Sequence, residues 1–282
     1  MLYLLTAILS SACMALVLRR FRDPEGNRYG IILGNYLTCI LLSVLMTPRG
    51  VRVLTGAPST LVMGLVAGAF FVAGLVMMQS SVHSCGAGLT AAFARLGLLV
   101  SLGVSVLFFR EQPGPLRLLG VVMVLAAMLL IRDPAEDGGG GKGKFWLLLL
   151  TLFFCGGADA MAKVFEQLGD PLESTRYFFW LFVTALALAA ALAVLERRRT
   201  GKKLLAKELA AGLLVGVPNY FSSYLLLRAL QSLPAFLVDP VYSTGTILLV
   251  LLAGALLFRE RLSRRRRIGV GLILAALVLL NL

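Results

Sequence analysis

The chain has 282 residues, of which 59% are hydrophobic and 15% charged, and its formal net charge is +13. Soluble domains contain about 45–50% apolar residues, so a chain this hydrophobic is expected to fold in a lipid bilayer. Its Lys and Arg residues lie in short tracts between apolar runs, which is typical of membrane-anchoring loops and argues against nucleic-acid binding. The four cysteines lie in or beside apolar runs without a CxxC spacing, and we expect neither a metal nor a cofactor.

Ten apolar runs follow one another along the chain, each bounded by charged residues, proline or glycine. A helix needs about 20 residues to cross the hydrocarbon core of a bilayer, so ten crossings with short loops use nearly the whole chain. The runs cover residues 2–18, 29–46, 61–82, 88–109, 116–131, 145–164, 177–195, 209–227, 235–258 and 268–282. The sequence therefore predicts an all-α polytopic membrane protein with ten transmembrane helices.

The two halves of the chain resemble each other. A tract with four consecutive glycines, at residues 137–144, divides them as a flexible linker would. Phe109-Arg110-Glu111 recurs 149 positions later as Phe258-Arg259-Glu260, and in both copies a glycine follows the glutamate by nine residues. We therefore predict a five-helix repeat at residues 1–132, a linker at 133–144 and a second repeat at 145–282. Five crossings are an odd number, so the copies would be inverted, with the binding site between them near the membrane midplane.

The duplicated motif and the five-plus-five pattern resemble the EamA-type branch of the drug/metabolite transporter superfamily over essentially the whole chain. The resemblance implies a secondary transporter with a central cavity and alternating access. Members of the family handle amino acids, sugars, nucleotide precursors and organic cations, so the resemblance does not name the substrate here.

Two arguments about membrane orientation disagree. The loops after the odd-numbered helices carry most of the Lys and Arg residues, and the positive-inside rule then makes these loops cytoplasmic and places both termini outside. The resembling transporters usually keep both termini in the cytoplasm. An inverted repeat is compatible with either orientation. In both cases we expect a multi-pass protein of a bacterial-type inner (plasma) membrane.

Ionisable side chains inside membrane helices are costly, which makes Arg95, Asp159 and Lys163 candidates for function. Asp159 and Lys163 are four residues apart and share a helix face. Either they form an internal ion pair that fixes the helix, or Asp159 binds a cation or proton and is released from Lys163 or Arg95 during transport. Arg95 suits a substrate carboxylate or phosphate, or satisfies helix-end carbonyls. The nearby Gly156 and Gly157 predict close helix packing or a local unwinding.

Polar and aromatic side chains within the predicted helices complete the predicted substrate-binding group. Either they line a cavity, where the rings would attract an amine, or they join neighbouring helices. These residues are Asn35, Tyr36, Trp180, Asn219, Tyr220, Tyr242, Ser243 and Thr244. We expect structural places for other polar residues: His83 in a loop, Asp239 at a helix cap, and Glu111 and Glu260 at a wet membrane edge, each paired with the preceding arginine.

These features favour a secondary active transporter of a small polar or amphiphilic metabolite, such as an organic cation, an amine or an amino-acid-like compound, driven by protons or by exchange. The alternatives are a flippase or scramblase of a lipid-linked carrier, and a membrane subunit that transports nothing alone. The sequence contains no nucleotide-binding loop and no hydrolase motif, so we expect no enzyme activity. The expected partners are a small-molecule substrate and the lipid bilayer, and the expected state is a monomer or homodimer.

Overall fold

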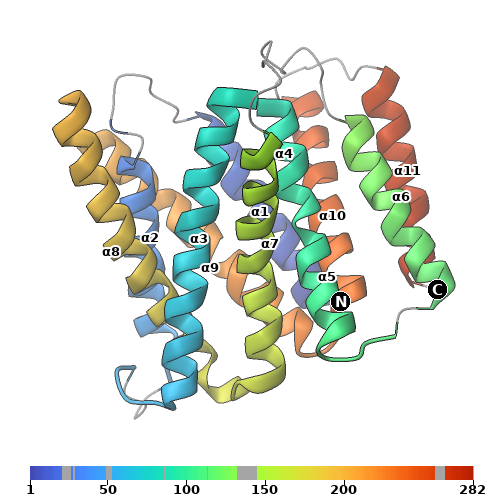
Figure 1. Ribbon diagram of the computed structural model, residues 1–282, viewed down its shortest axis with the longest axis horizontal. Helices are drawn as coiled ribbons and strands as arrows, with labels where there is room; N and C mark the ends of the chain where they lie inside the picture. The colour runs from blue at the N-terminus through green and yellow to red at the C-terminus, as the bar shows by residue number, and fades with distance from the viewer. Residues whose placement is uncertain are drawn as a thin grey trace. The chain divides into compact units, whose positions relative to one another are not determined.

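The computed structural model describes residues 1–20, 27, 29–48, 53–85, 87–112, 114–131, 145–257 and 264–281, which form helices and no β-strand (Figure 1). The helices are α1 (Leu2–Arg20), α2 (Gly30–Leu45), α3 (Pro58–Cys85), α4 (Ala87–Leu96), α5 (Leu98–Leu107), α6 (Pro115–Ile131), α7 (Phe145–Leu168), α8 (Ser174–Thr200), α9 (Ala206–Leu230), α10 (Ala235–Leu257) and α11 (Arg264–Asn281), with a 3₁₀ turn, η2, at Pro171–Glu173. The predicted linker at 133–144 and the second motif copy at 258–260 lie outside the described residues.

Within the described residues, five helices are long and apolar enough to cross a bilayer. They cover Pro58–Val82, Phe145–Leu168, Pro171–Thr200, Ala206–Leu230 and Ala235–Ala253, and they coincide with five of the ten predicted membrane helices. Four more predicted helices are found as shorter apolar helices, at Leu2–Val17, Gly30–Leu45, Phe93–Leu107 and Leu118–Ala127. The all-α membrane class is therefore confirmed, and the count of ten crossings stays a prediction.

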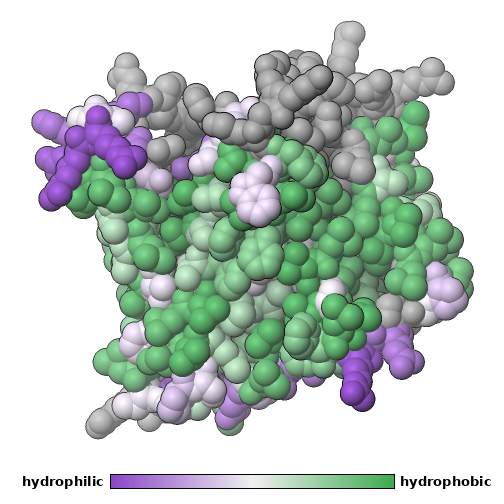
Figure 2. Space-filling model, viewed as in Figure 1, coloured by the Kyte–Doolittle hydropathy of each residue, from purple (hydrophilic) through white to green (hydrophobic). Residues whose placement is uncertain are grey.

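Large apolar side chains point outward from the helices. In α1, Leu5 and Leu9 are 62% and 63% exposed. Figure 2 shows hydrophobic residues over most of the visible helix surface, while hydrophilic residues gather near helix ends. The last turn of α8, for example, carries Arg197, Arg198 and Arg199. Such a surface is unfavourable in water and is matched by lipid chains.

The described helices form two compact units, each of which takes segments from both halves of the sequence. Unit 1 contains Met1–Val72 and Val164–Arg228, and unit 2 contains Ala73–Lys163 and Ala229–Leu282. The boundaries predicted at 132 and 145 separate two repeats of the sequence. The two units are defined by contacts in space, so they do not test these boundaries.

Unit 1 is held together by close helix contacts and by aromatic rings. The helix α2 packs along α8 (Figure 1). It also approaches α9 so closely that a Cβ atom on Gly34 would lie 3.0 Å from Cα of Gly212, so only glycine fits there. Rings from α7, α8 and α9 pack against one another, and they belong to Phe165, Tyr177, Phe178, Phe182, Tyr220 and Tyr224.

Unit 2 is built around two helix pairs. The helix α6 packs along α11, and α5 along α10 (Figure 1). Their apolar side chains form a core of Leu98, Leu102, Val121, Val124, Phe236, Leu237 and Ala276. The helices α3 and α7 are joined by a hydrogen bond of 2.8 Å between the hydroxyls of Ser81 and Thr151.

The predicted helix at 88–109 is broken into α4 and α5 at Gly97. The N–H of Val100 donates to the Gly97 carbonyl at 2.8 Å, a bond three residues back that tightens the turn. Gly97 lies against α7, where its Cβ atom, if present, would be 2.7 Å from the nitrogen of Gly156. The prediction of close packing at Gly156 is therefore confirmed. The alternative, an unwinding there, is wrong because α7 continues through Gly156 and Gly157, and the break lies in the helix packed against it.

Candidate functional site

Five charged side chains gather in unit 2, and we call them the charged cluster. They are Arg95 at the end of α4, Glu111 after α5, Asp159 and Lys163 on α7, and Asp239 on α10. Arg95 attracts the charge of Asp159, and Asp239 lies within electrostatic range of Asp159, Lys163 and Glu111. Within the described residues these carboxylates do not come close enough to hold a metal ion together. The structure thus brings together three predicted site residues, Arg95, Asp159 and Lys163. It adds Glu111 and Asp239, for which we expected only structural roles.

Lys163 and Glu111 form a buried ion pair. Lys163 Nζ lies 2.7 Å from Glu111 Oε1, and the two side chains are 1% and 15% exposed. The second carboxylate oxygen of Glu111, Oε2, is buried and accepts no hydrogen bond from the described part of the chain. The expectation of a wet glutamate paired with Arg110 is therefore wrong. The pair instead ties the end of α5 to α7, where removing one partner would leave an uncompensated charge.

The backbone at Arg110 explains why Glu111 turns inward. Arg110 has φ of 54°, a left-handed conformation that non-glycine residues rarely adopt. The N–H of Glu111 then donates to the Ser105 carbonyl at 3.1 Å, which folds the chain back over the end of α5. Arg110 itself is left exposed. The first Phe-Arg-Glu motif thus ends a helix and returns its carboxylate to the interior of unit 2.

Asp239 lies inside α10, four residues after its first residue, Ala235. Its Oδ2 atom accepts a hydrogen bond of 2.5 Å from Ser101 Oγ on α5, and the residue is 7% exposed. The predicted capping role is therefore wrong. Pro240, which suggested a helix start, is accommodated within the helix, although a proline there supplies no N–H to the preceding turn.

Asp159 differs from Glu111 and Asp239 because it is exposed. It lies in the second half of α7, one turn after Cys155, and it faces Arg95. A charged side chain in contact with hydrocarbon costs about 2.5–3.5 kcal/mol on insertion scales, so the exposed carboxylate is best explained by access to water. A carboxylate beside a guanidinium can bind a ligand that carries charge, with either group exchanging its partner for the ligand.

Four predicted binding residues lie in unit 1 and contribute to helix packing. Asn219 Nδ2 donates to Asn35 Oδ1 at 3.1 Å, which joins α9 to α2. The rings of Tyr36 and Tyr220 are buried and pack on Phe182, with centroid distances of 6.0 Å and 6.4 Å. These contacts favour the alternative in which the side chains join helices rather than line a cavity.

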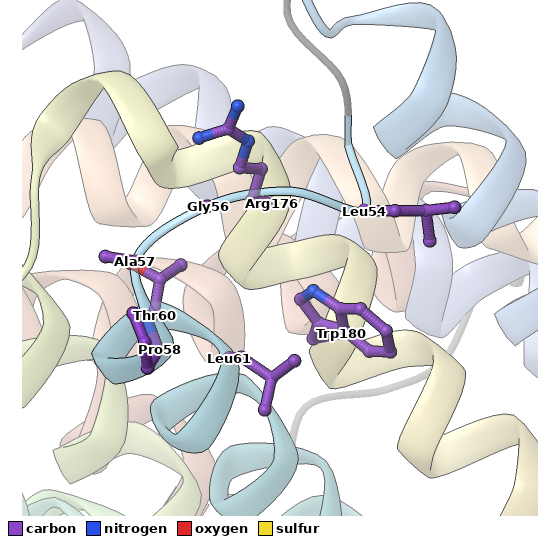
Figure 3. A pocket seen from close by; sticks show the side chains of 8 residues that line it. All are labelled: Leu54, Gly56, Ala57, Pro58, Thr60, Leu61, Arg176 and Trp180. Carbon is purple, nitrogen blue, oxygen red and sulfur yellow. The ribbon is translucent and has the colours of Figure 1, made fainter.

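Trp180 lines a pocket of about 210 Å³ in unit 1 near the start of α8 (Figure 3). Two lining residues, Thr60 and Arg176, are already bound to a neighbouring carboxylate: Glu173 accepts hydrogen bonds of 2.5 Å from Thr60 Oγ1 and 2.6 Å from Arg176 Nη1. They attach the first turn of α3 to the start of α8. The other residues lining the pocket are Leu54, Gly56, Ala57, Pro58 and Leu61.

The last three predicted residues follow Asp239 on α10. Tyr242 and Ser243 lie three and four residues after it, so they share its helix face. Thr244 is fully buried, and its hydroxyl donates to the Pro240 carbonyl in its own helix at 2.5 Å. The predicted binding group is therefore divided, with these residues and the charged cluster in unit 2 and the others in unit 1.

Three residues of this site were not among the predicted ones. Glu111 carried a signal, because it belongs to the duplicated motif. The sequence also contains a signal for Asp239, because it is an ionisable residue inside the predicted helix at 235–258. Ser101 carried none, because serines are common in membrane helices.

Known proteins resemble this chain in sequence and in fold. Residues 142–282 match the EamA-like transporter family. An uncharacterized protein of Haemophilus influenzae is 25% identical over 97% of this chain and 95% of its own length. A protein of known crystal structure is 17% identical and has a TM-score of 0.80, with 99% of this chain and 94% of that chain covered. At this identity the structural match shows a shared fold.

Proposed function

Because the chain belongs to the EamA-like transporter family, we propose that it is a secondary active transporter that works by alternating access. Membership makes it a multi-pass membrane transporter of the drug/metabolite transporter superfamily. The proposed substrate is a small polar or amphiphilic metabolite with an amine or amino-acid-like group, bound at Asp159 and Arg95. The observation that carries this proposal is the exposed carboxylate of Asp159 within an apolar membrane helix.

The charges at this site support a substrate with a cationic group. An amine can replace Arg95 as the partner of Asp159, and a carboxylate on the same substrate can then bind the released guanidinium, so that no charge is left unpaired in the membrane. Tyr242, which is half-buried on the helix face of Asp239, supplies a ring for the apolar part of such a ligand.

The contacts between helices support the proposed arrangement of ten crossings in two inverted repeats. In the predicted repeats, α2 is equivalent to α8, α5 to α10 and α6 to α11. These three pairs pack more extensively than the other described helix pairs. Helices related by a two-fold axis contact each other where they lie on that axis, as inverted repeats require. The family match also begins at residue 142, close to the start of the proposed second repeat at 145.

Transport by the purified protein in liposomes tests this proposal. The wild-type protein is screened for stabilisation by a panel of amines and amino acids, and the compounds that bind are then followed into liposomes. We expect Asp159→Asn to abolish uptake, because the site loses the charge that binds the amine. Asp170→Asn is the matched control: Asp170 caps η2 through its bond to the N–H of Leu172, and asparagine caps equally well.

Two outcomes would contradict the proposal. Uptake by Asp159→Asn at the wild-type rate would remove Asp159 from the site. A wild-type protein that moves fluorescent lipids across the bilayer but none of the metabolites would instead be a flippase or scramblase.

A further inference from the structure

Asp239 is a buried carboxylate that the proposed substrate site does not use. It is 7% exposed, and its described hydrogen bond comes from the hydroxyl of Ser101. The helices α6 and α11, which also pack against α10, contribute apolar side chains such as Val124 and Ala276. A metabolite or hydrated ion cannot reach a carboxylate in these surroundings without moving the helices, whereas a proton can reach it along hydrogen bonds.

Charged groups face Asp239 from α7 and from the segment after α5. They are Asp159 and Lys163 on α7 and Glu111 after α5, and Arg95 on α4 faces Asp159 in turn. Among the residues that the structure describes, the charged cluster therefore holds three carboxylates and two cationic groups. With all five ionised it has one negative charge in excess, which is costly among apolar helices.

The partners of the three carboxylates indicate which of them carries the excess negative charge. Glu111 is paired with Lys163 at 2.7 Å, and Asp159 is attracted by Arg95. Asp239 instead accepts its hydrogen bond from a neutral hydroxyl. A single proton on Asp239 brings the cluster to neutrality and preserves both the Lys163–Glu111 ion pair and the attraction between Arg95 and Asp159.

We propose that Asp239, positioned by Ser101, is the proton-binding site that couples substrate movement to proton movement, an inference that rests on the proposed transport function. When the cationic group of a substrate reaches Asp159, its charge replaces that of the proton. The O–H bond of Asp239 then breaks, the carboxylate keeps the electron pair, and the proton passes to the water that reaches Asp159. Release of the substrate lets a proton return, so that proton and substrate alternate as exchange requires.

The proton site is tested without any substrate by infrared spectroscopy of the protein in liposomes between acidic and alkaline pH. We expect the band of a protonated carboxyl group in the wild type, the same band with a lower pH midpoint in Asp159→Asn, which removes one negative charge from the cluster, and loss of the band in Asp239→Asn. Ser101→Ala should shift the pH midpoint of the band upward, because the ionised carboxylate loses its donor, and Ser101→Thr should restore the midpoint. A purely structural serine would not move this midpoint.

Coupling is tested with the dye pyranine trapped inside the same liposomes, to which primary amines are added outside. We expect the wild-type protein to move protons in response. Asp239→Asn should lose the proton signal but still exchange labelled for unlabelled amino acid, because a zwitterion adds no net charge to the cluster.

The possible results separate this inference from the proposed function. Proton movement by Asp239→Asn at the wild-type rate, or a band unchanged in that variant, overturns the inference while transport stands. A wild-type band that is lost in Asp239→Asn, without movement of any compound, supports the proton site and overturns the transport function. If Asp239→Asn does not fold, equal midpoints in the wild type, Ser101→Ala and Ser101→Thr overturn the inference.

Discussion

Replacing Lys163 by methionine would remove one half of a buried ion pair. Lys163 Nζ lies 2.7 Å from Glu111 and the lysine side chain is 1% exposed, so neither water nor lipid headgroups can replace it. Removing one partner of a buried pair costs about 3–5 kcal/mol, because the other charge is left uncompensated. We expect Lys163→Met near the top of this range, because Arg95, the cationic group of the cluster that remains, interacts with Asp159.

Replacing Glu111 by glutamine removes the other half of the pair with a smaller expected loss. In Lys163→Met the charged cluster keeps three carboxylates but only one cationic side chain. In Glu111→Gln it keeps two carboxylates and two cationic side chains. The second variant therefore reaches neutrality by releasing a proton, and we expect it to lose about 1.5–3 kcal/mol, the contribution of a hydrogen bond to a charged group. The double variant should be more stable than Lys163→Met alone.

Unfolding in detergent micelles by a denaturing detergent, followed by circular dichroism, measures these differences. Lys203→Met is the control, because Lys203 is exposed between α8 and α9 and its removal should change the free energy of unfolding by less than about 0.5 kcal/mol. A larger loss for Glu111→Gln than for Lys163→Met, or strictly additive losses in the double variant, would refute this account of the cluster.

Three further substitutions test the packing around the site by the same unfolding measurement. Gly156→Ala should lose about 1–3 kcal/mol, because its Cβ atom would overlap the Gly97 carbonyl, while Gly103→Ala, which has open space, should be neutral or stabilising; equal effects would contradict the close contact. Arg110→Gly should gain about 1 kcal/mol by relieving the left-handed backbone, and a loss of stability would show that the arginine side chain matters. Asn219→Ala should lose about 1 kcal/mol by breaking its bond to α2, and an unchanged stability accompanied by lost transport would instead return this residue to the substrate site.

The membrane helices could be predicted from sequence because lipid leaves the backbone few choices. An apolar run of about 20 residues must satisfy its own N–H and C=O groups, and a helix does so. The runs at 61–82, 145–164 and 235–258 were therefore found with small errors at their ends. The break at Gly97 could not be found in this way, because its cause is Gly156, a residue distant in sequence that packs against it.

The site was predictable only in part, for a related reason. A charge inside an apolar run identifies Arg95 and Asp159 by their cost alone. Glu111 lies beyond the end of its run, and what brings it inside is the left-handed backbone of Arg110, which no pattern in the sequence indicates. Polarity alone also selected Asn219, although its amide is bound to a neighbouring helix.

Asp159 and Asp239 differ in what can reach them, and we propose that this difference couples the substrate to the proton. Asp159 is exposed and can meet a solute, whereas Asp239 is buried and can meet only a proton. Because both belong to a cluster with one excess negative charge, one positive charge at either of them brings it to neutrality, and a second would make it positive in a medium that disfavours net charge. A cationic solute and a proton therefore exclude each other without sharing a binding group. For a zwitterion the same balance predicts no net exchange of protons, since its two charges cancel at Asp159 and Arg95. The stoichiometry of coupling is thus set by the charge of the substrate, and the fold only has to hold the five groups within range of one another.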